Sequence, residues 1–251
     1  MEAKKEVEEY WKTNPKFESK INPESYGIHK LVSYASSKMK DNELMLDAGC
    51  GSKPYKGYFQ SEKYIGMDFR IASPQSPPEM LSDIRCIPLK DSSIDGILCT
   101  QVLEYVPEPE EVLKEFFRVL KPNGKLFIAV PQSAEVSEGR EGEKASYPYD
   151  YFRFAKSGIT YLLEKVGFTV IFVEPRGGYF WYIGHRLRML GIWAKELNKI
   201  LGVPFYFLFS ILIPLLCFYL DEWSRRFESI WQATSKWTLG YNIYVTKPTL
   251  E

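Results

Sequence analysis

The chain has 251 residues, a length that fits one α/β domain with an elaboration or two small domains. Its 32 Lys and Arg residues balance 32 Asp and Glu residues, so the formal net charge is zero. Because proteins that bind nucleic acid normally carry a basic surplus, we do not expect a nucleic-acid substrate.

The cysteines and the beginning of the chain bear on metal binding and location. No two of the four cysteines form a C-x-x-C pair, so neither a metal site nor a disulfide framework is indicated. Residues 1–10 are rich in Lys and Glu and lack the apolar stretch of a secretory signal. We therefore expect the folded domain to face the cytoplasm.

Hydrophobic patterning predicts alternating helices and strands. Apolar residues recur at helical spacing over residues 28–39, and short apolar runs at 44–46 and 64–67 predict the first two strands. The pattern then continues with strands at 97–100, 125–130 and 169–173, and with helices at 112–120 and 159–166. Such alternation predicts a parallel sheet with right-handed crossovers.

A glycine turn follows the first predicted strand. Residues 46–52 read L-D-A-G-C-G-S, and Gly49 and Gly51 allow a sharp turn with bare backbone facing a ligand. The second predicted strand ends in Asp68, an acid placed to accept hydrogen bonds from a ribose diol. Together these features predict a nucleoside pocket at the carboxyl edge of the sheet.

The residues after the glycine turn narrow the identity of the nucleoside. A dinucleotide fingerprint needs a third small residue, but Pro54 stands at that position, and no P-loop Lys with Ser or Thr is present. The D-A-G-C-G-S turn, Asp68, Asp83 and the stretch I-P-L-K-D-S-S-I-D instead resemble the class I S-adenosylmethionine-dependent methyltransferases, most closely the type 11 branch. The resemblance covers residues 26–174 and resumes at 239–247.

The resemblance implies a fold and a domain arrangement. We expect an α/β, Rossmann-like sheet of seven strands, mostly parallel, with an antiparallel last strand at 239–246 beside the sixth. S-adenosyl-L-methionine is the implied cofactor. The expected parts are an N-terminal extension at 1–25, a methyltransferase domain at 26–176 and 239–251, and a helical insertion at 177–238.

The resemblance also implies cofactor-binding residues. Asp47 and the backbone of Gly49 and Gly51 look like the part that holds the methionine moiety, and Asp68 looks like the ribose ligand. Without a role in binding, Gly49 and Gly51 would simply form a tight turn, and Asp68 would be an acid in a surface turn.

Further along the chain, Asp83 and Ile84 resemble the pair that meets the adenine, and Gln101 stands where the family lines the pocket below the sulfonium. Asp83 could instead cap a helix. Tyr105 replaces the histidine of an acid–histidine pair found in most relatives, so a histidine base is not expected at that position.

The insertion contains 20 residues without a charge, 201–220. By length this run would pass as a transmembrane helix. Both of its ends must lie in one compartment if the sixth and seventh strands pair, and Pro214 disfavours a straight helix. With basic residues on both flanks, we expect two arms of about ten residues in a re-entrant or surface-lying hairpin on the cytoplasmic leaflet. Packing on the domain or in a dimer interface is the alternative.

Candidate acceptor-side residues follow the fifth predicted strand. Residues 147–154 combine five aromatics with Asp150 and Arg153, which suggests a lid whose Arg153 could bind a phosphate or carboxylate. An oxygen acceptor would need a base. The candidates are Asp150, His185 and Glu104, although an ordinary structural role is open for each of them.

Our main hypothesis is a membrane-associated methyltransferase that acts on a small or lipid-borne acceptor, such as a saccharide or lipid-linked glycan. Two other hypotheses compete with it. One is a cofactor-binding scaffold that docks a partner through the apolar insertion. The other is a nicotinamide oxidoreductase, which Pro54 disfavours. The acids and glycines of the implied site are all present, which favours activity over a decayed site.

Overall fold

The computed structural model describes residues 2–15, 20–133, 149–197 and 202–249. Its sheet contains β1 (Met45–Ala48), β2 (Tyr64–Asp68), β3 (Met80–Leu81), β4 (Ile94–Thr100), β5 (Leu120–Pro131), β6 (Thr169–Pro175) and β7 (Gly240–Thr246). The strand order is β3-β2-β1-β4-β5-β7-β6. β7 runs antiparallel to both β5 and β6, while the pairs from β3 through β5 are parallel. The expected seven-stranded Rossmann-like sheet is confirmed.

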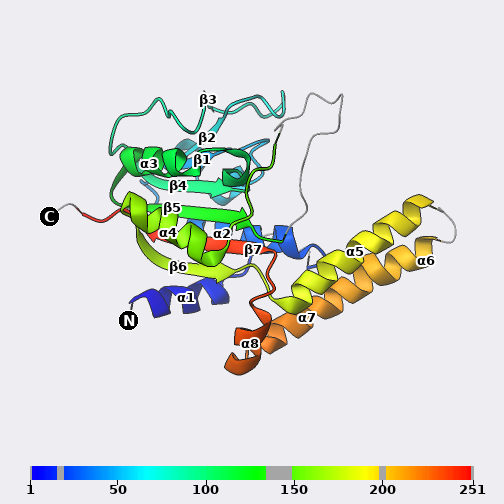
Figure 1. Cartoon of the computed structure of the whole chain (residues 1–251). Helices are drawn as coiled ribbons and strands as arrows, with labels where there is room; N and C mark the ends of the chain where they lie inside the picture. Colours follow the sequence, from blue (N-terminus) through cyan, green and yellow to red (C-terminus); the bar gives the residue numbers. More distant parts are fainter. Residues whose placement is uncertain (1, 16–19, 134–148, 198–201, 250–251) are drawn as a thin grey trace.

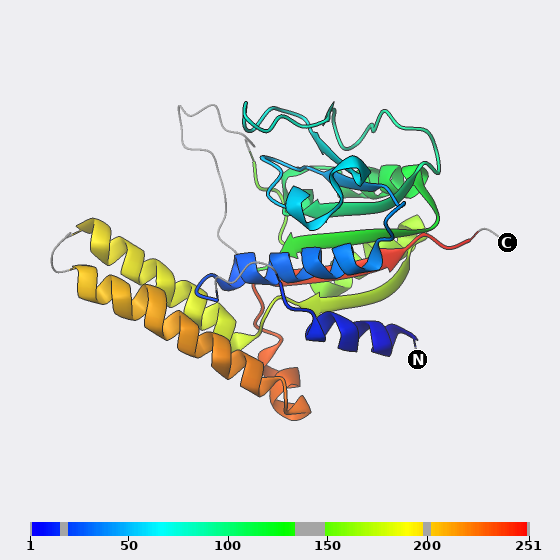
Figure 2. The same ribbon diagram turned by 180° about the vertical axis from the view of Figure 1, so that it is seen from behind.

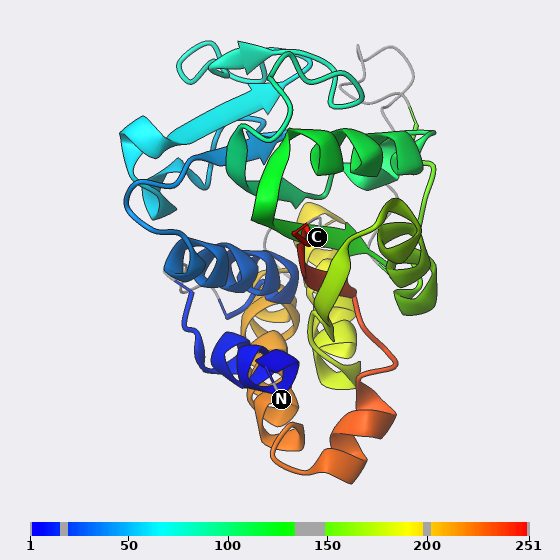
Figure 3. The same ribbon diagram turned by 90° about the vertical axis from the view of Figure 1, so that its left-hand side faces the viewer.

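Helices cover both faces of this sheet (Figure 3). One face carries α3 (Pro109–Val119) and α4 (Lys156–Val166), and the other carries α1 (Glu2–Lys12) and α2 (Pro23–Lys38). Figure 2 shows α2 lying across the sheet on the face opposite α3 and α4. Asn22 caps α2 by accepting a hydrogen bond from the Ser25 N–H, and Pro23 occupies the first turn, where its missing N–H costs nothing.

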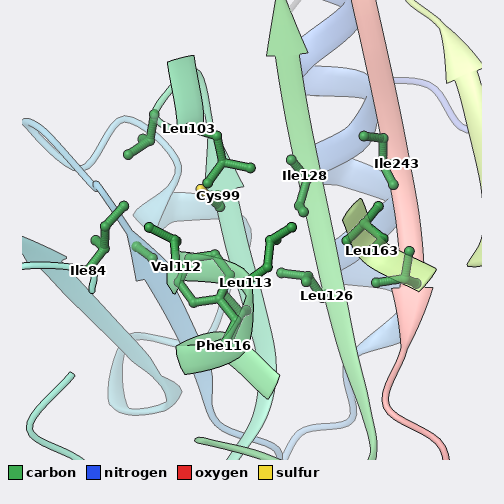
Figure 4. Close-up of a cluster of buried hydrophobic side chains, with 14 of the residues drawn as sticks. Ile84, Cys99, Leu103, Val112, Leu113, Phe116, Leu126, Ile128, Leu163 and Ile243 are labelled. Atoms are coloured by element: carbon green, nitrogen blue, oxygen red, sulfur yellow. The ribbon is translucent and has the colours of Figure 1, made fainter. Parts of the chain in front are cut away.

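The alternation of strand side chains divides the core into two layers. Neighbouring residues of β4 and β5 point to opposite faces, as the pleat requires. Ile97 and Leu126 join the cluster beneath α3 and α4, whereas Leu98 and Phe127 join the cluster beneath α1 and α2. Figure 4 shows the first cluster, with Phe116 of α3 packed toward the sheet.

Between β6 and β7 the chain forms a helical hairpin that projects from the sheet (Figure 1). Its helices are α5 (Tyr179–Leu197), α6 (Gly202–Phe207) and α7 (Ile213–Ser224), followed by the short α8 (Glu228–Thr234). α5 packs along α6 and α7. Gly191 of α5 allows close approach, because a Cβ there would lie 2.3 Å from Ser210 Oγ.

The apolar run departs from the two-arm expectation. α6, a π-helical turn at Leu208–Leu212, and α7 join into one helix of 23 residues, Gly202–Ser224, so the prediction of two short arms around Pro214 is wrong. The Ile213 N–H donates to the Leu208 carbonyl in the wider π turn. This turn accommodates Pro214, whose ring and missing N–H would disrupt a regular α-helical ladder.

Candidate active site

The glycine turn after β1 is fixed by backbone hydrogen bonds to the end of β2. The N–H groups of Gly49 and Cys50 donate to the Met67 carbonyl at 2.8 and 3.0 Å. Gly49 has φ = 83°, and a Cβ at this position would lie 2.3 Å from a methyl carbon of Val102. A side chain is therefore excluded at position 49 by both conformation and space.

Asp68 lies at the carboxyl end of β2 and is 1% exposed. One carboxylate oxygen accepts a 2.9 Å hydrogen bond from the Gly51 N–H, and the other accepts one of 3.2 Å from the Arg70 N–H. Asp68 therefore holds the glycine turn in place. Each carboxylate oxygen can accept a second hydrogen bond, so the group can also receive a diol.

A mainly apolar pocket of about 200 Å³ opens beside this turn. We call it the apolar pocket; its lining is Gly49, Asp68, Phe69, Asp83, Ile84, Arg85, Val102, Tyr105, Val106 and Pro107. The structure thus brings together four of the predicted cofactor-binding residues, Gly49, Asp68, Asp83 and Ile84.

Asp83 is held as a carboxylate at the rim of this pocket. The Arg85 guanidinium pairs with it at 2.7 Å and lowers the pKa of the Asp83 carboxyl below its usual value. Arg85 also reaches Glu108 at 2.9 Å, so Asp83 is part of a surface ion-pair network.

Asp47 lies behind the turn and does not line the apolar pocket. The Tyr64 hydroxyl donates a hydrogen bond to Asp47 Oδ2. Burial, reinforced by the negative charge of Asp68, raises the pKa of Asp47 to about 7, although the Tyr64 hydrogen bond opposes this shift. Direct contact between Asp47 and a methionine moiety stays a prediction.

A second, more polar pocket of about 330 Å³ lies next to the first. We call it the polar pocket; it is lined by Glu24, Ser25, Ile28, Gln101, Glu104, Tyr105, Pro131, Asp150, Arg153 and His185. It therefore collects all three candidate bases together with Gln101. Tyr105 lines both pockets, so its side chain lies between them.

Glu104 is the most strongly perturbed acid in the polar pocket. It is 1% exposed, and its Oε2 has no hydrogen-bond partner among the residues that the structure describes. Burial raises the pKa of Glu104 to about 8, against the opposing effect of the positive charge of Arg176. A carboxyl that titrates near neutral pH is suited to exchange a proton with a bound ligand.

Asp150 and His185 complete the candidate bases. Asp150 pairs with Arg153, with Nη2 and Oδ2 2.6 Å apart, so Arg153 is engaged by an acid of its own segment. His185 is buried on α5, which places one residue of the hairpin in the wall of the polar pocket. Residues 147 and 148 of the predicted aromatic lid lie outside the described residues.

Two residues of this region were not predicted from the sequence. Glu24 lies in the first turn of α2, and the Gln101 amide donates to it at 3.3 Å. Arg176 directly follows β6 and is fully buried. Its position just beyond the carboxyl end of a predicted strand is the signal that could have pointed to it.

Comparisons with known proteins agree with this geometry. Residues 46–128 match the family model described as a methyltransferase domain, in its type 11 form. The chain is 30% identical over 155 residues to a protein of Mycolicibacterium smegmatis described as a probable S-adenosylmethionine-dependent methyltransferase, covering 57% of this chain and 58% of that one. These matches show similarity to methyltransferases over part of the chain, with the family model restricted to residues 46–128.

Another protein to which the chain is similar is the ubiquinone biosynthesis O-methyltransferase of Pseudomonas aeruginosa. It is 25% identical over 167 residues, covering 66% of this chain and 58% of the relative. The chain thus spans little more than half the length of either relative, and neither relative fixes its acceptor.

Solved structures support the methyltransferase fold. The Burkholderia thailandensis 1,6-didemethyltoxoflavin-N1-methyltransferase superposes with a TM-score of 0.53 at 13% identity, covering 89% of this chain and 79% of that one. The [4+2]-cyclase SpnF gives a TM-score of 0.54 at 18% identity, with 88% and 79% coverage. Because a cyclase shares the fold, the fold alone does not fix the reaction.

The residues present fit S-adenosylmethionine, the cofactor named in the description of the Mycolicibacterium relative. The bare backbone at Gly49 is open to the apolar pocket, and Asp68 lies at its edge, where a ribose diol would be bound. Ile84 offers an apolar surface for a base ring. Within the described residues, no group of three or more His, Cys, Asp or Glu side chains is placed to hold a metal ion.

Proposed function

We propose that this chain transfers a methyl group from S-adenosylmethionine to a small or lipid-borne acceptor at the cytoplasmic face of a membrane. The observation that carries the proposal is that the two pockets are neighbours, since Tyr105 lines both of them. One pocket is lined by four residues predicted to bind the cofactor, and the other is lined by the three candidate bases. Donor and acceptor bound in these pockets would meet at their boundary.

On the donor side, Asp68 would bind the ribose, while Asp83 and Ile84 would contact the adenine. Gly49, Gly51 and Gln101 would lie along the remainder of the donor. The cofactor supplies a methyl group already activated by its sulfonium. The protein therefore needs mainly to hold the two reactants in line, and such positioning can account for a large part of the rate enhancement.

On the acceptor side, Glu104 is the base that the environment favours most. An acceptor hydroxyl would pass its proton to Glu104 Oε2 while its oxygen forms the bond to the methyl carbon and the bond from that carbon to sulfur breaks. Asp150, fixed by Arg153, and His185 would hydrogen-bond and orient the acceptor. The relative named as an O-methyltransferase supports oxygen as the acceptor atom.

Membrane association is supported by the surface of the hairpin. Leu212, Leu216, Tyr219 and Trp223 are all exposed, and their spacing of three and four residues places them on one face of a helix. The opposite face, with Ser210 among its buried residues, packs against α5. A row of exposed apolar side chains along a projecting helix is typical of a surface that contacts a membrane or a partner protein.

The charges of the hairpin favour a surface-lying rather than a re-entrant arrangement. α5 carries Arg186, Arg188 and Lys195 along its length, and burying these in hydrocarbon would be costly. A hairpin that rests on the surface with the α6–α7 stripe in the interface keeps these cations near anionic headgroups. Both ends of the hairpin then stay on one side of the membrane, as the pairing of β6 with β7 requires.

A lipid-borne acceptor, such as a lipid-linked glycan, suits this arrangement. His185 belongs to the hairpin and also lines the polar pocket, so the proposed membrane-facing element and the acceptor site are adjacent. An acceptor anchored in the bilayer could enter the pocket along α5 without leaving the membrane.

Incubation of the protein with methyl-labelled S-adenosylmethionine and a membrane lipid extract tests the proposal. We expect label in the lipid fraction with the wild-type chain and at least a tenfold lower rate with Glu104→Gln. Cofactor binding without any transfer would instead support the scaffold reading, in which the hairpin docks a partner.

A further inference from the structure

Another cavity lies at the base of the hairpin, between α1 and the turn that joins α7 to α8 (Figure 1). We call it the basal groove; it has a volume of about 750 Å³. Its lining is Lys4, Val7, Glu8, Trp11, Lys12, Glu174, Glu222, Arg225, Arg226, Glu228 and Trp231. None of these residues lines the apolar or the polar pocket, so the proposed methyl transfer gives the basal groove no role.

Arg225 is held against two tryptophans in the wall of this groove. Its guanidinium carbon lies 4.1 Å from the centroid of the Trp11 ring and 5.9 Å from that of Trp231. The two indoles meet edge to face, with centroids 5.7 Å apart. Contacts of a guanidinium with aromatic rings are attractive and restrict its orientation. The groove therefore presents a positioned cation beside a broad apolar surface.

The acids of the lining are largely engaged by other groups. Glu222 pairs with Arg225. Glu174 accepts a 2.9 Å hydrogen bond from the Trp11 indole N–H, and Glu228 accepts one of 3.2 Å from a side-chain amide of α8. Within the described ranges, Glu8 is the single acid of the lining for which no such partner is found. The four acids therefore leave little negative charge for a ligand to meet.

The cations of the lining are less engaged. Lys4, Lys12 and Arg226 are exposed and form no ion pair with any residue that the structure describes. They come from α1 and from the α7–α8 turn, and all of them line the same groove as Arg225. The charge that awaits a partner is thus positive, and the groove fits an anion.

The basal groove begins where the α6–α7 stripe ends. Trp223, the last residue of the stripe, packs against the exposed Phe227 with ring centroids 5.0 Å apart. Between and beside these two aromatics in the sequence stand Glu222, Arg225 and Arg226, which line the groove. Tryptophans and basic side chains are typical of the headgroup level of a bilayer. A hairpin that rests on a membrane would hold the groove at the level of the lipid phosphates.

We propose that the basal groove binds the phosphate group of a phospholipid, with Arg225 and Arg226 as its main donors and Lys4 and Lys12 around it. The planar fork of an arginine suits phosphate, because two parallel N–H groups can donate to two of its oxygens. This inference deepens the proposed function and rests on its membrane contact. It adds a headgroup contact to the apolar contact of the stripe.

Calorimetric titration with dihexanoyl phosphatidylglycerol, kept as a monomer in solution, tests the site without the electric field of a membrane surface. We expect saturable binding with one site per wild-type chain. The double variant Lys12→Gln, Arg226→Gln should bind at least tenfold more weakly, the usual effect of losing hydrogen bonds to a charged group. Inorganic phosphate should also bind the wild-type chain at least tenfold more weakly, because it has no acyl chains to contact Trp223 and Phe227.

The matched control is Lys40→Gln, Lys90→Gln, which removes the same charge from two exposed positions of the sheet domain. Its affinity for the lipid should stay within about twofold of wild type. Arg226→Lys keeps the charge without the planar fork and should give an intermediate loss.

Three results would overturn the site: no saturable binding by the wild-type chain, no loss in the groove variant, or an equal loss in the control. Phosphate that binds as tightly as the lipid would overturn the assignment to a lipid. Methyl transfer by the detergent-solubilised chain is measured alongside. Lipid binding without any transfer would refute the proposed function and leave the site intact, whereas transfer without lipid binding would refute the site alone.

Discussion

Glu104 is the residue whose environment bears most directly on the proposed reaction. Its carboxyl is buried at the wall of the polar pocket, and its pKa is raised to about 8. If Glu104 takes the acceptor proton, the rate of methyl transfer should rise with pH and level off above about 8, since the base must be ionised. The pH–rate profile of the wild-type chain measures this. A profile with the same rise in Glu104→Gln would assign the base to another group.

The same carboxyl predicts a pH dependence of stability. Its pKa in the folded chain, about 8, lies above its ordinary value of 4.5, so the folded state retains the proton more strongly than the unfolded state. The stability that this group contributes is fully present below pH 4.5 and is lost as the pH rises through 8. Glu104→Gln should therefore unfold at a higher temperature than wild type at pH 9, with a smaller difference at pH 5. Equal unfolding temperatures at pH 9 would contradict the burial assigned to Glu104.

Asp68 combines a structural and a binding role, which sets its expected mutational effect. Asp68→Ala removes the acceptor of the Gly51 N–H as well as the proposed ribose ligand. We expect the affinity for S-adenosylhomocysteine to fall by roughly 1.5–3 kcal/mol, the range for hydrogen bonds to a charged group. Calorimetry measures the loss. An unchanged affinity would remove Asp68 from the site.

The residues of the glycine turn could be predicted, and Arg176 could not, for physical reasons. Gly49, Gly51 and Asp68 form a local strand–turn–strand pattern whose geometry depends mainly on neighbouring residues. The burial of Arg176 depends on space left by Gly27 and Gly240, far away in the sequence, and becomes visible only when the fold brings them together.

At the scale of elements, the long strands and helices were predictable because their apolar periodicity is strong. β3 was not located, since Met80–Leu81 contains two residues and no pattern can be read from so short a strand. The course of the apolar run was also mispredicted. Pro214 would break a regular α-helix, but the π turn just before it allows the helix to continue through this position.

The exposed stripe of the hairpin gives a prediction of its own. The double variant Leu212→Glu, Leu216→Glu places two negative charges on the face proposed to contact anionic lipid. It should reduce co-flotation with vesicles that contain anionic phospholipid at least tenfold, while the unfolding temperature changes little because both residues are exposed.

The matched control for this test is Tyr161→Glu. It changes an exposed apolar residue of α4, which belongs to the sheet domain and not to the hairpin. Vesicle binding should be unaffected by this control. Retention of binding by the hairpin variant would show that the apolar stripe is not the membrane contact.

At the scale of the whole molecule, the hairpin and the pockets share one end of the sheet. The chain leaves β6, forms the hairpin, and returns through β7, which lies between β5 and β6 in the same sheet. Contact of the hairpin with a membrane would therefore fix the orientation of the polar pocket, through His185 on α5, relative to the lipid surface. This link between anchoring and acceptor access supports a lipid-borne acceptor.

The central claim is that the apolar pocket beside the glycine turn binds an adenosyl donor. Calorimetric titration of the wild-type chain with S-adenosylhomocysteine and, separately, with NAD tests it most directly. We predict saturable binding of S-adenosylhomocysteine with one site per chain and no heat of binding for NAD. Saturable binding of NAD, with none for S-adenosylhomocysteine, would contradict the account.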